Sequence, residues 1–181
     1  MPDFPDINIE IISDYALADT VADRYDAGVR LGEHVDKDMI SVRIGPDFRL
    51  VVVGAPSYFE NHARTTSPQE LTEYSCIGLR LPTHDGFYAW PYGKDGRELN
   101  KRVRGRAAFN SMDMMMEAAL SGFGLAMVPD DVAREDVEAG RLVQVLTDWT
   151  PRRAGYHLYY PSRRQHAPAF ALVLEALRYR G

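Results

Sequence analysis

The 181-residue sequence is poor in the side chains that build cross-links and metal sites. It has one cysteine, Cys76, which excludes an internal disulfide and a cysteine-rich zinc site. The five histidines stand far apart, and none lies three or four residues from another histidine or from the cysteine. We therefore expect no metal site and no cofactor. Cys76 begins the apolar run Cys76-Ile77-Gly78-Leu79, which predicts a buried, unreactive thiol.

An excess of basic charge and long apolar runs are also missing. The net charge is -5 and the pI is near 5.5, so the polypeptide as a whole does not attract nucleic acid. No basic segment followed by an apolar core opens the sequence, and no apolar run is long enough to cross a membrane. These absences predict a cytoplasmic protein with no membrane partner.

Catalytic patterns are missing as well. Residues 121–124, Ser-Gly-Phe-Gly, place the serine at the end of an expected helix, whereas a nucleophile elbow needs it at the start. A dinucleotide fingerprint needs a third glycine and a following helix, and here a strand is expected to follow. We therefore expect that the chain is not an enzyme.

The clearest pattern in the sequence is a strand, turn, helix and strand unit over residues 107–129. Asn110 and Ser111 suit the N-cap of a helix, which we expect to begin near Met112. Apolar residues then recur at three- and four-residue spacing until Gly122 ends the helix, and residues 125–128 form an apolar strand.

The start of this helix is a candidate anion site. Its free N–H groups and positive dipole end favour a carboxylate, and the Asn110 and Ser111 side chains stand beside them. The alternative is that both residues only cap the helix, which is their commonest role. Asp113 in the first turn also satisfies the dipole by itself.

The rest of the chain alternates strands with helices, which is typical of an α/β protein with a parallel or mixed sheet. The Asp95-Gly96 pair indicates a hairpin within residues 82–106. Five basic residues in 97–106 are either the solvated face of this ribbon or a site for a phosphate or acidic partner. The expected strands are 7–12, 27–31, 49–53, 76–81, 125–128, 142–146 and 156–160, and the expected helices are 14–25, 56–61, 68–74, 112–121, 131–139 and 168–179.

Several segments in a fixed order carry a family resemblance. They are residues 26–32 (Asp-Ala-Gly-Val-Arg-Leu-Gly), 55–59 with 67–71, 109–113 with 118–126 and Pro129, and 140–149 leading to 160–164. Together they resemble the effector-binding domain of LysR-type transcriptional regulators over nearly the whole chain. Each segment alone is weak, but their order and spacing are specific.

The resemblance implies an α/β fold of two lobes, like the type II periplasmic binding proteins, with a chain that crosses twice between the lobes. We expect a first lobe of residues 1–73 and 152–181 and a second lobe of residues 74–151. The resemblance also implies an effector in the cleft between the lobes, a small organic molecule for which a carboxylate is one candidate group. The implied effector-binding residues are Ser13, Asp14, Arg30, Leu31, Gly32, Leu81, Pro82, Thr83, Asn110 and Ser111. Arg30 suits a carboxylate through its bidentate fork, although an ion pair with an acidic residue is an equal alternative.

The sequence departs from the family pattern at its start. It has no helix-turn-helix, so we expect DNA contact only through such a motif outside this chain. The strand and helix that open the family's effector domain also have no counterpart, so we expect an N-terminally truncated domain. Residues 7–12 and 27–31 would then lack the strand between them. We expect the exposed edges to recruit a second copy, giving a homo-oligomer, unless they close on each other or stay poorly ordered.

Three functions remain in competition. The leading one is the effector-sensing domain of a LysR-type DNA-binding regulator, in which ligand binding modulates transcription. The second is a free-standing cytoplasmic small-molecule-binding protein, or a degenerate regulator fragment without DNA binding. The third is a small enzyme on the same fold, which the missing catalytic groups disfavour.

Overall fold

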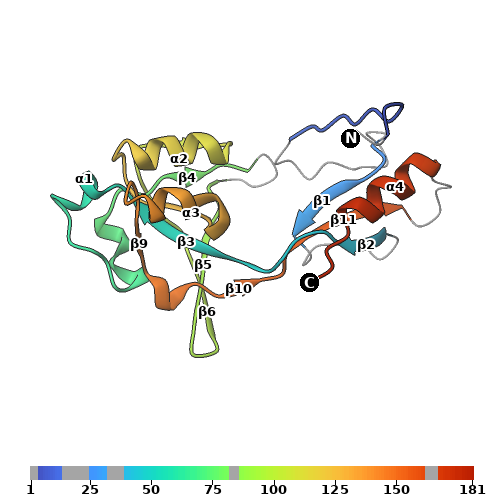
Figure 1. Ribbon diagram of the computed structural model, residues 1–181. Helices are drawn as coiled ribbons and strands as arrows, with labels where there is room; N and C mark the ends of the chain where they lie inside the picture. Colours follow the sequence, from blue (N-terminus) through green and yellow to red (C-terminus); the bar gives the residue numbers. More distant parts are fainter. Residues whose placement is uncertain (1–3, 14–24, 32–38, 82–85, 162–166) are drawn as a thin grey trace. The chain divides into compact units, whose positions relative to one another are not determined.

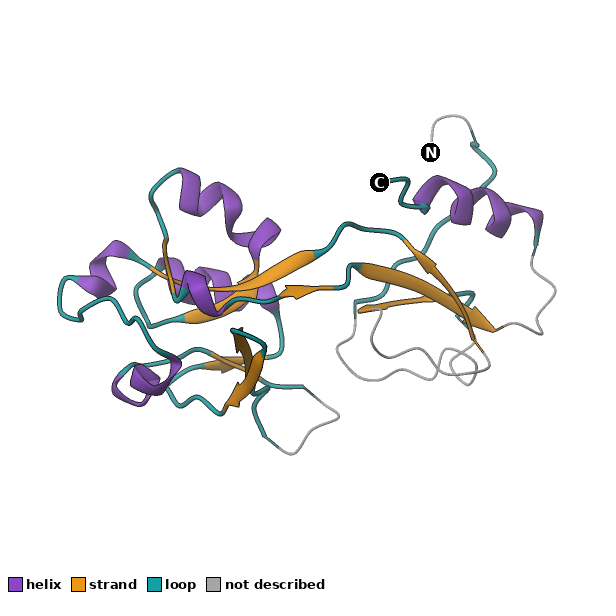
Figure 2. Cartoon of the chain, turned by 90° about the horizontal axis from the view of Figure 1, so that it is seen from below, coloured by secondary structure: helices purple, strands orange, loops and turns teal. Residues whose placement is uncertain are grey.

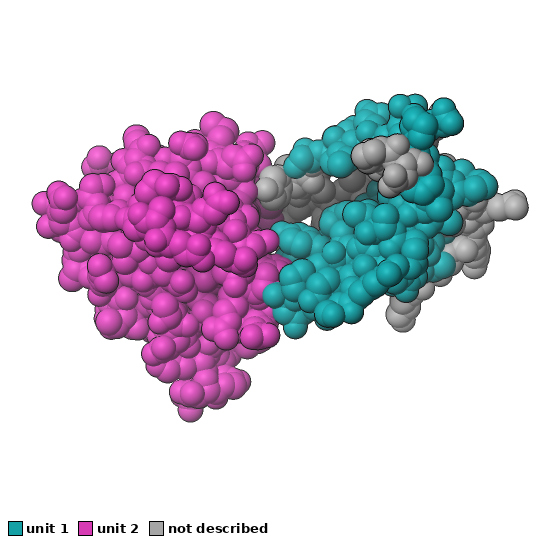
Figure 3. All heavy atoms as spheres, viewed as in Figure 1, with its two compact units in different colours: residues 1–47, 154–181 teal, residues 48–153 magenta. Residues whose placement is uncertain are grey.

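The structure, a computed structural model, describes residues 4–13, 25–31, 39–81, 86–161 and 167–181 and consists of two compact units. Unit 1 comprises Met1–Asp47 and Ala154–Gly181, and unit 2 comprises Phe48–Arg153 (Figure 3). The chain therefore passes from unit 1 to unit 2 and back again.

Unit 1 is built on a three-stranded antiparallel sheet. Its strands are β1 (Gly28–Leu31), β11 (Tyr156–Pro161) and β2 (Met39–Arg43), in the order β1-β11-β2. Helix α4 (Pro168–Leu177) lies beside this sheet (Figures 1 and 2). Phe170 of the helix and Tyr160 of β11 form an edge-to-face pair with ring centroids 5.1 Å apart. No residue of α4 is buried, so this helix covers the sheet incompletely.

The expected strand over residues 7–12 is wrong, because the segment has no strand structure and makes no ladder with another strand. Its apolar alternation is not buried either, since Ile9, Ile11 and Ile12 are 52%, 87% and 55% exposed. Alternation favours a strand only when a partner strand and a covering layer are present. The expected strand at 27–31 is confirmed as β1, and the expected helix over 14–25 lies almost wholly outside the described residues.

Unit 2 is organised around β3 (Phe48–Gly54). This strand pairs antiparallel with β8 (Ala126–Pro129) along one edge, and with β9 (Val143–Val145) and β10 (Arg152–Arg153) along the other (Figure 1). Its side chains alternate between two hydrophobic clusters, with Val51 and Val53 in one and Val52 in the other. Because both faces are covered, β3 reads in the sequence as a continuous apolar run.

Different helices and strands supply the residues of the two clusters. Helices α2 (Met112–Leu120) and α3 (Asp130–Glu138) supply the first, which includes Met115 and Ala133. The hairpin of β5 (Trp90–Lys94) and β6 (Arg97–Lys101) supplies Trp90 and Tyr92 to the second. Short α1 (Pro56–Phe59) and the 3-10 helices η1 (Pro68–Glu73) and η2 (Thr147–Trp149) complete unit 2.

The hairpin prediction is confirmed. Asp95 and Gly96 both have positive φ, 50° and 73°, which is the conformation of a type I′ turn between twisted strands. At Gly105, two backbone segments lie very close together, because an added Cβ would lie 1.9 Å from the carbonyl oxygen of Cys76. Gly105 thus lets the segment before β7 (Ala108–Phe109) lie directly beside the segment that leads into β4 (Gly78–Leu79).

The boundary between the units differs from the lobe boundary expected from the sequence. The expected first lobe extended to residue 73, whereas residues 48–73 belong to unit 2. The reason is the pairing of β3 with β8 and β9, which ties the start of this segment to the unit 2 sheet. At the return, residue 154 begins the second part of unit 1, close to the expected residue 152.

Candidate functional site

The carboxyl ends of two parallel strands meet in unit 2. Strand β4 pairs with β7 in parallel register, Gly78 opposite Ala108 and Leu79 opposite Phe109. The N–H of Arg80 donates to the carbonyl oxygen of Phe109 over 2.8 Å, which keeps the two chains together beyond the ladder. Arg80 and Asn110 therefore follow neighbouring strands at the same edge, the position at which α/β proteins bind ligands.

Helix α2 starts at this edge without a side-chain cap. Ser111 is its N-cap residue, with extended backbone angles of φ −133° and ψ 131°, but its side chain makes no capping hydrogen bond. Ser111 therefore occupies the predicted N-cap position, and its hydroxyl does not satisfy an N–H group of the first turn. Because the first turn of a helix carries N–H groups without intrahelical partners, the start of α2 still offers donors for an anion.

A cavity of about 360 Å³ opens at the same place. Its lining residues are Arg80, Ala108, Phe109, Asn110 and Met114. The Arg80 side chain is exposed, and its guanidinium forms no ion pair within the described part of the chain. Met114 is 52% exposed and supplies apolar surface to the cavity. The cavity thus combines an unpaired positive charge, an amide and an apolar wall.

The sequence-predicted site residues fall into three groups. In unit 2, Leu81 follows β4 and packs against the first cluster, on the same strand edge as Asn110 and Ser111. In unit 1, Ser13 is exposed in a segment without regular structure, and Arg30 and Leu31 are the last residues of β1. The remaining four, Asp14, Gly32, Pro82 and Thr83, lie outside the described residues.

Arg30 does not have a free guanidinium. Its guanidinium carbon lies 4.9 Å from the centroid of the Tyr159 ring, on the neighbouring strand β11. Such a cation–π contact stabilises the sheet by itself. Arg30 therefore has a structural contact within unit 1, and its role in effector binding stays a prediction.

Arg80 is the residue that the sequence reasoning missed. The apolar run 76–81 predicted a strand through Leu81, and the family resemblance implied Leu81 as the first site residue of this segment. The observed strand ends at Leu79, so Arg80 is the first residue beyond it. A charged residue inside an otherwise apolar run was the available signal, because such a residue is rare in the middle of a buried strand.

The comparisons with known proteins agree on one family. The family model described as LysR substrate binding domain matches residues 1–181. The chain belongs to this family. It is therefore an effector-binding domain of the kind found in LysR-type transcriptional regulators, and its α/β fold is the type II periplasmic-binding-protein-like fold of their regulatory domains.

Two relatives are longer than this chain. The sequence is 48% identical over 177 residues to a putative transcriptional regulator of Pseudomonas aeruginosa, covering 98% of the chain and 58% of that protein. It is 42% identical over 177 residues to the HTH-type transcriptional regulator PgrR of Escherichia coli, covering 98% of the chain and 59% of that protein. The chain thus spans less than two thirds of the length of these relatives.

Solved structures show the same fold. The regulatory domain of AphB from Vibrio vulnificus superposes with a TM-score of 0.80 at 22% identity, covering 98% of this chain and 86% of that one. The full-length Vibrio cholerae virulence activator AphB superposes with a TM-score of 0.80 at 26% identity, covering 98% and 59%. Within the described residues, no helix is both long and apolar enough to traverse a membrane.

Cys76 is buried as the sequence predicted, with 1% of its surface exposed. Burial raises the pKa of its thiol to about 12. The thiolate is the reactive form of cysteine, so we expect this side chain to be unreactive in the folded protein.

Proposed function

We propose that this domain senses a small organic carboxylate and that binding modulates transcription through a DNA-binding LysR-type regulator. DNA is contacted only by a helix-turn-helix outside residues 1–181, and the chain has no enzymatic activity of its own. The site of action is the cytoplasm. In support, relatives at 48% and 42% identity are named as transcriptional regulators. The acidic net charge of -5 also disfavours DNA binding by these residues.

The observation that carries the ligand class is the set of donors around Arg80. Arg80 and Asn110 line the cavity, and Ser111, the N-cap residue of α2, makes no side-chain capping hydrogen bond. All of these groups donate hydrogen bonds, and charge-assisted bonds from arginine to a carboxylate are among the strongest. The apolar part of the ligand would lie on Phe109 and Met114, which line the same cavity.

Regulation then follows from differential affinity. A ligand shifts a conformational equilibrium only by the difference in its affinity for the two states. A carboxylate that fixes the start of α2 favours the conformations in which Arg80 and Asn110 stay together. The predicted contacts from unit 1, namely Ser13, Arg30 and Leu31, remain part of this proposal, as do Asp14, Gly32, Pro82 and Thr83.

The test is a thermal-shift and calorimetric titration of the chain with acetate, benzoate and succinate, each paired with its neutral amide. We expect at least one carboxylate to bind saturably while its amide does not. Arg80→Gln should abolish this binding. Arg97→Gln is the matched control, because Arg97 lies on the exposed strand β6 and does not line the cavity. Equal binding by the Arg80→Gln variant would contradict the proposal.

We also propose that the chain forms homo-oligomers through unit 1. Strand β1 is an edge strand of its sheet among the described residues, and its Val29 is 53% exposed. Ile9, Ile11 and Ile12 add further exposed apolar surface in the same unit. Uncovered edges and apolar patches recruit partners. Light scattering coupled to size exclusion should show a dimer or larger species, and a monomer at every concentration would contradict this.

A further inference from the structure

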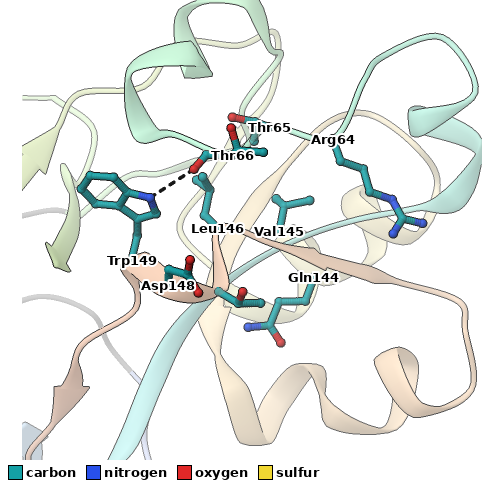
Figure 4. Close-up of a pocket in the computed structure, with 9 residues that line it drawn as sticks. Arg64, Thr65, Thr66, Gln144, Val145, Leu146, Asp148 and Trp149 are labelled. Atoms are coloured by element: carbon teal, nitrogen blue, oxygen red, sulfur yellow. Dashed lines mark hydrogen bonds between the residues drawn. The ribbon is translucent and has the colours of Figure 1, made fainter.

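Each unit contains a hydrogen bond that joins segments far apart in the sequence. In unit 2, the indole N–H of Trp149 donates to the carbonyl oxygen of Thr66 over 3.1 Å, which ties η2 to a loop of the same unit (Figure 4). In unit 1, the backbone N–H of Tyr179 donates to the carbonyl oxygen of Arg43 over 3.0 Å. Arg43 ends β2, an edge strand among the described residues, so this second bond closes part of a sheet edge.

The register of β2 shows that Tyr179 binds its outer side. Directly after β2, the N–H of Ile44 donates to the carbonyl oxygen of Tyr156 over 2.9 Å, so the backbone groups of Ile44 face β11. In an antiparallel pair, residues whose backbone groups face the partner strand alternate with residues whose groups face away. The backbone groups of Arg43 and Ser41 therefore face away from β11. The bond from Tyr179 reaches Arg43 from this outer side.

Side chains support the same contact. The guanidinium carbon of Arg43 lies 5.1 Å from the ring centroid of Tyr179, which is within the range of a cation–π contact. Two further bonds orient this guanidinium: Nε donates to the carbonyl oxygen of Gly45 over 2.9 Å, and Nη2 donates to the carboxylate of Asp47 over 2.8 Å. Tyr179 thus covers the end of β2 with both its backbone and its ring.

The residues on both sides of Tyr179 are tied to the last turn of α4. The carboxylate of Glu175 accepts a hydrogen bond from Arg180 over 2.7 Å, and its other oxygen lies 3.4 Å from Nε of Arg178. Arg178 leaves the helix with φ −57° and ψ 119°, an extended conformation. Exposed ion pairs of this kind are individually weak, so several small contacts together hold the segment 178–180.

The opposite edge of the sheet differs from the β2 edge. Val29 of β1 is 53% exposed, and no backbone hydrogen bond from another described segment reaches it outside the sheet. A sheet with one open edge can pair with one other copy, and this two-fold contact closes a dimer. A sheet with two open edges allows continued addition of copies.

We propose that residues 178–180 form a C-terminal clip, which blocks the β2 edge and limits unit 1 to association through β1. This inference rests on, and refines, the oligomerisation proposed above. The association that the clip prevents is with a second copy of this chain, because an edge strand that pairs antiparallel with its own copy satisfies two-fold symmetry. Release of the clip opens a second edge and leads to larger assemblies.

Tyr179→Pro releases the clip, because proline has neither the N–H donor nor the aromatic ring. The extended conformation of Arg178 is compatible with a proline after it. In light scattering coupled to size exclusion, we expect species larger than a dimer, with a mass that rises with protein concentration. Tyr179→Phe keeps both contacts and is the matched control, so it should retain the mass of the parent chain. Far-UV circular dichroism checks that both variants are folded.

A second substitution locates the new contact. Ser41→Pro removes an outward N–H from β2 without removing a bond to β11, so it should return the Tyr179→Pro variant to the mass of the parent chain. Glu175→Gln loosens the clip at α4 without changing β2, so it provides the same test if Tyr179→Pro does not fold.

The clip would be overturned by a folded Tyr179→Pro variant with the mass of the parent chain at every concentration. Growth that Ser41→Pro leaves unchanged would overturn it as well. A monomeric parent chain would contradict only the association through β1. In that case the clip predicts that Tyr179→Pro forms a dimer and nothing larger.

Discussion

The two units bury apolar side chains to very different extents. Both hydrophobic clusters of the described chain lie entirely within unit 2, and β3 and β8 there are covered on both faces. In unit 1, the buried apolar residues among those described are Leu158, Tyr159 and Tyr160, all on the central strand β11. Helix α2 of unit 2 buries four residues, whereas α4 of unit 1 buries none.

This difference shows that apolar residues stabilise the fold only where they are buried. Helix α4 is strongly apolar, yet Leu172 and Leu177 are each 43% exposed. Burial stabilises by about 25 cal/mol for each Å² of apolar surface removed from water, so exposed residues contribute little. We therefore expect unit 2 to determine the stability of the folded chain and unit 1 to open first. The candidate ligand cavity at Arg80 lies in the unit with the buried core.

The largest expected effect comes from removing a leucine in each unit. Leu125 is fully buried in the second cluster, so Leu125→Ala should lower the free energy of unfolding by about 2–5 kcal/mol. Leu172→Ala in α4 should cost less than about 0.5 kcal/mol, as is usual at exposed positions. Urea unfolding monitored by far-UV circular dichroism measures both variants, because both units contain helices and strands, whereas both tryptophans lie in unit 2. Similar losses in the two variants would refute the comparison.

Replacing one glycine in each unit by alanine compares how closely the backbone is packed at the two positions. In unit 2, Gly105→Ala would push a Cβ to 1.9 Å from the Cys76 carbonyl oxygen, where the backbone must move. Overpacking of this kind costs about 1–3 kcal/mol. In unit 1, Gly45→Ala meets nothing closer than 3.7 Å and should be near neutral. The thermal unfolding midpoint of each variant is the measurement, and an unchanged midpoint for Gly105→Ala would count against the tight packing of β4 and β7.

The pH dependence of unit 2 gives a smaller effect. The pKa of Cys76 is raised from 9.0 to about 12 in the folded chain, so the unfolded thiol ionises first as pH rises. The contribution of this thiol to the free energy of unfolding is complete below pH 9. It is lost as pH rises from 9 to 12, by at most about 1.4 kcal/mol per pH unit. Burial also raises the pKa of Tyr58 and Tyr92, which act in the same direction.

The control for this pH dependence is Cys76→Ala. Its urea midpoint should fall less steeply between pH 8 and 10 than that of the parent chain, because only the tyrosines then remain. The parent thiol should also react with a disulfide reagent only as fast as unit 2 unfolds. Rapid modification of the native protein at pH 8 would show that Cys76 is accessible.

The sequence predicted the elements of unit 2 well because their signals are local. The run over residues 49–53, the helix that starts after Ser111 and the Asp95-Gly96 turn each carry a pattern that neighbouring residues complete. Most of the observed ends of these helices and strands lie within two residues of the predicted ends. The segment 68–74, expected as a helix, is the 3-10 helix η1, and Pro68 at its start fits both forms.

The predictions that failed concern features that depend on contacts between residues distant in the sequence. The alternation in residues 7–12 resembles a half-buried strand, but a strand needs a partner that local sequence does not specify. The same limit applies to the candidate site. Asn110 and Ser111 could be found from the helix start, whereas Arg80 joins them only through the parallel pairing of β4 with β7. The predicted contacts in unit 1 stay predictions.

Hydrogen exchange of the whole chain, with and without saturating carboxylate from the titration panel, tests most directly whether unit 2 holds both the stable core and the ligand cavity. Without ligand, we expect amides of β3, β8 and α2 to exchange slowest and those of β1 and α4 to exchange fastest. With ligand, added protection should appear at Arg80 and at residues 110–114. Equal protection of both units, or ligand protection confined to unit 1, would contradict this expectation.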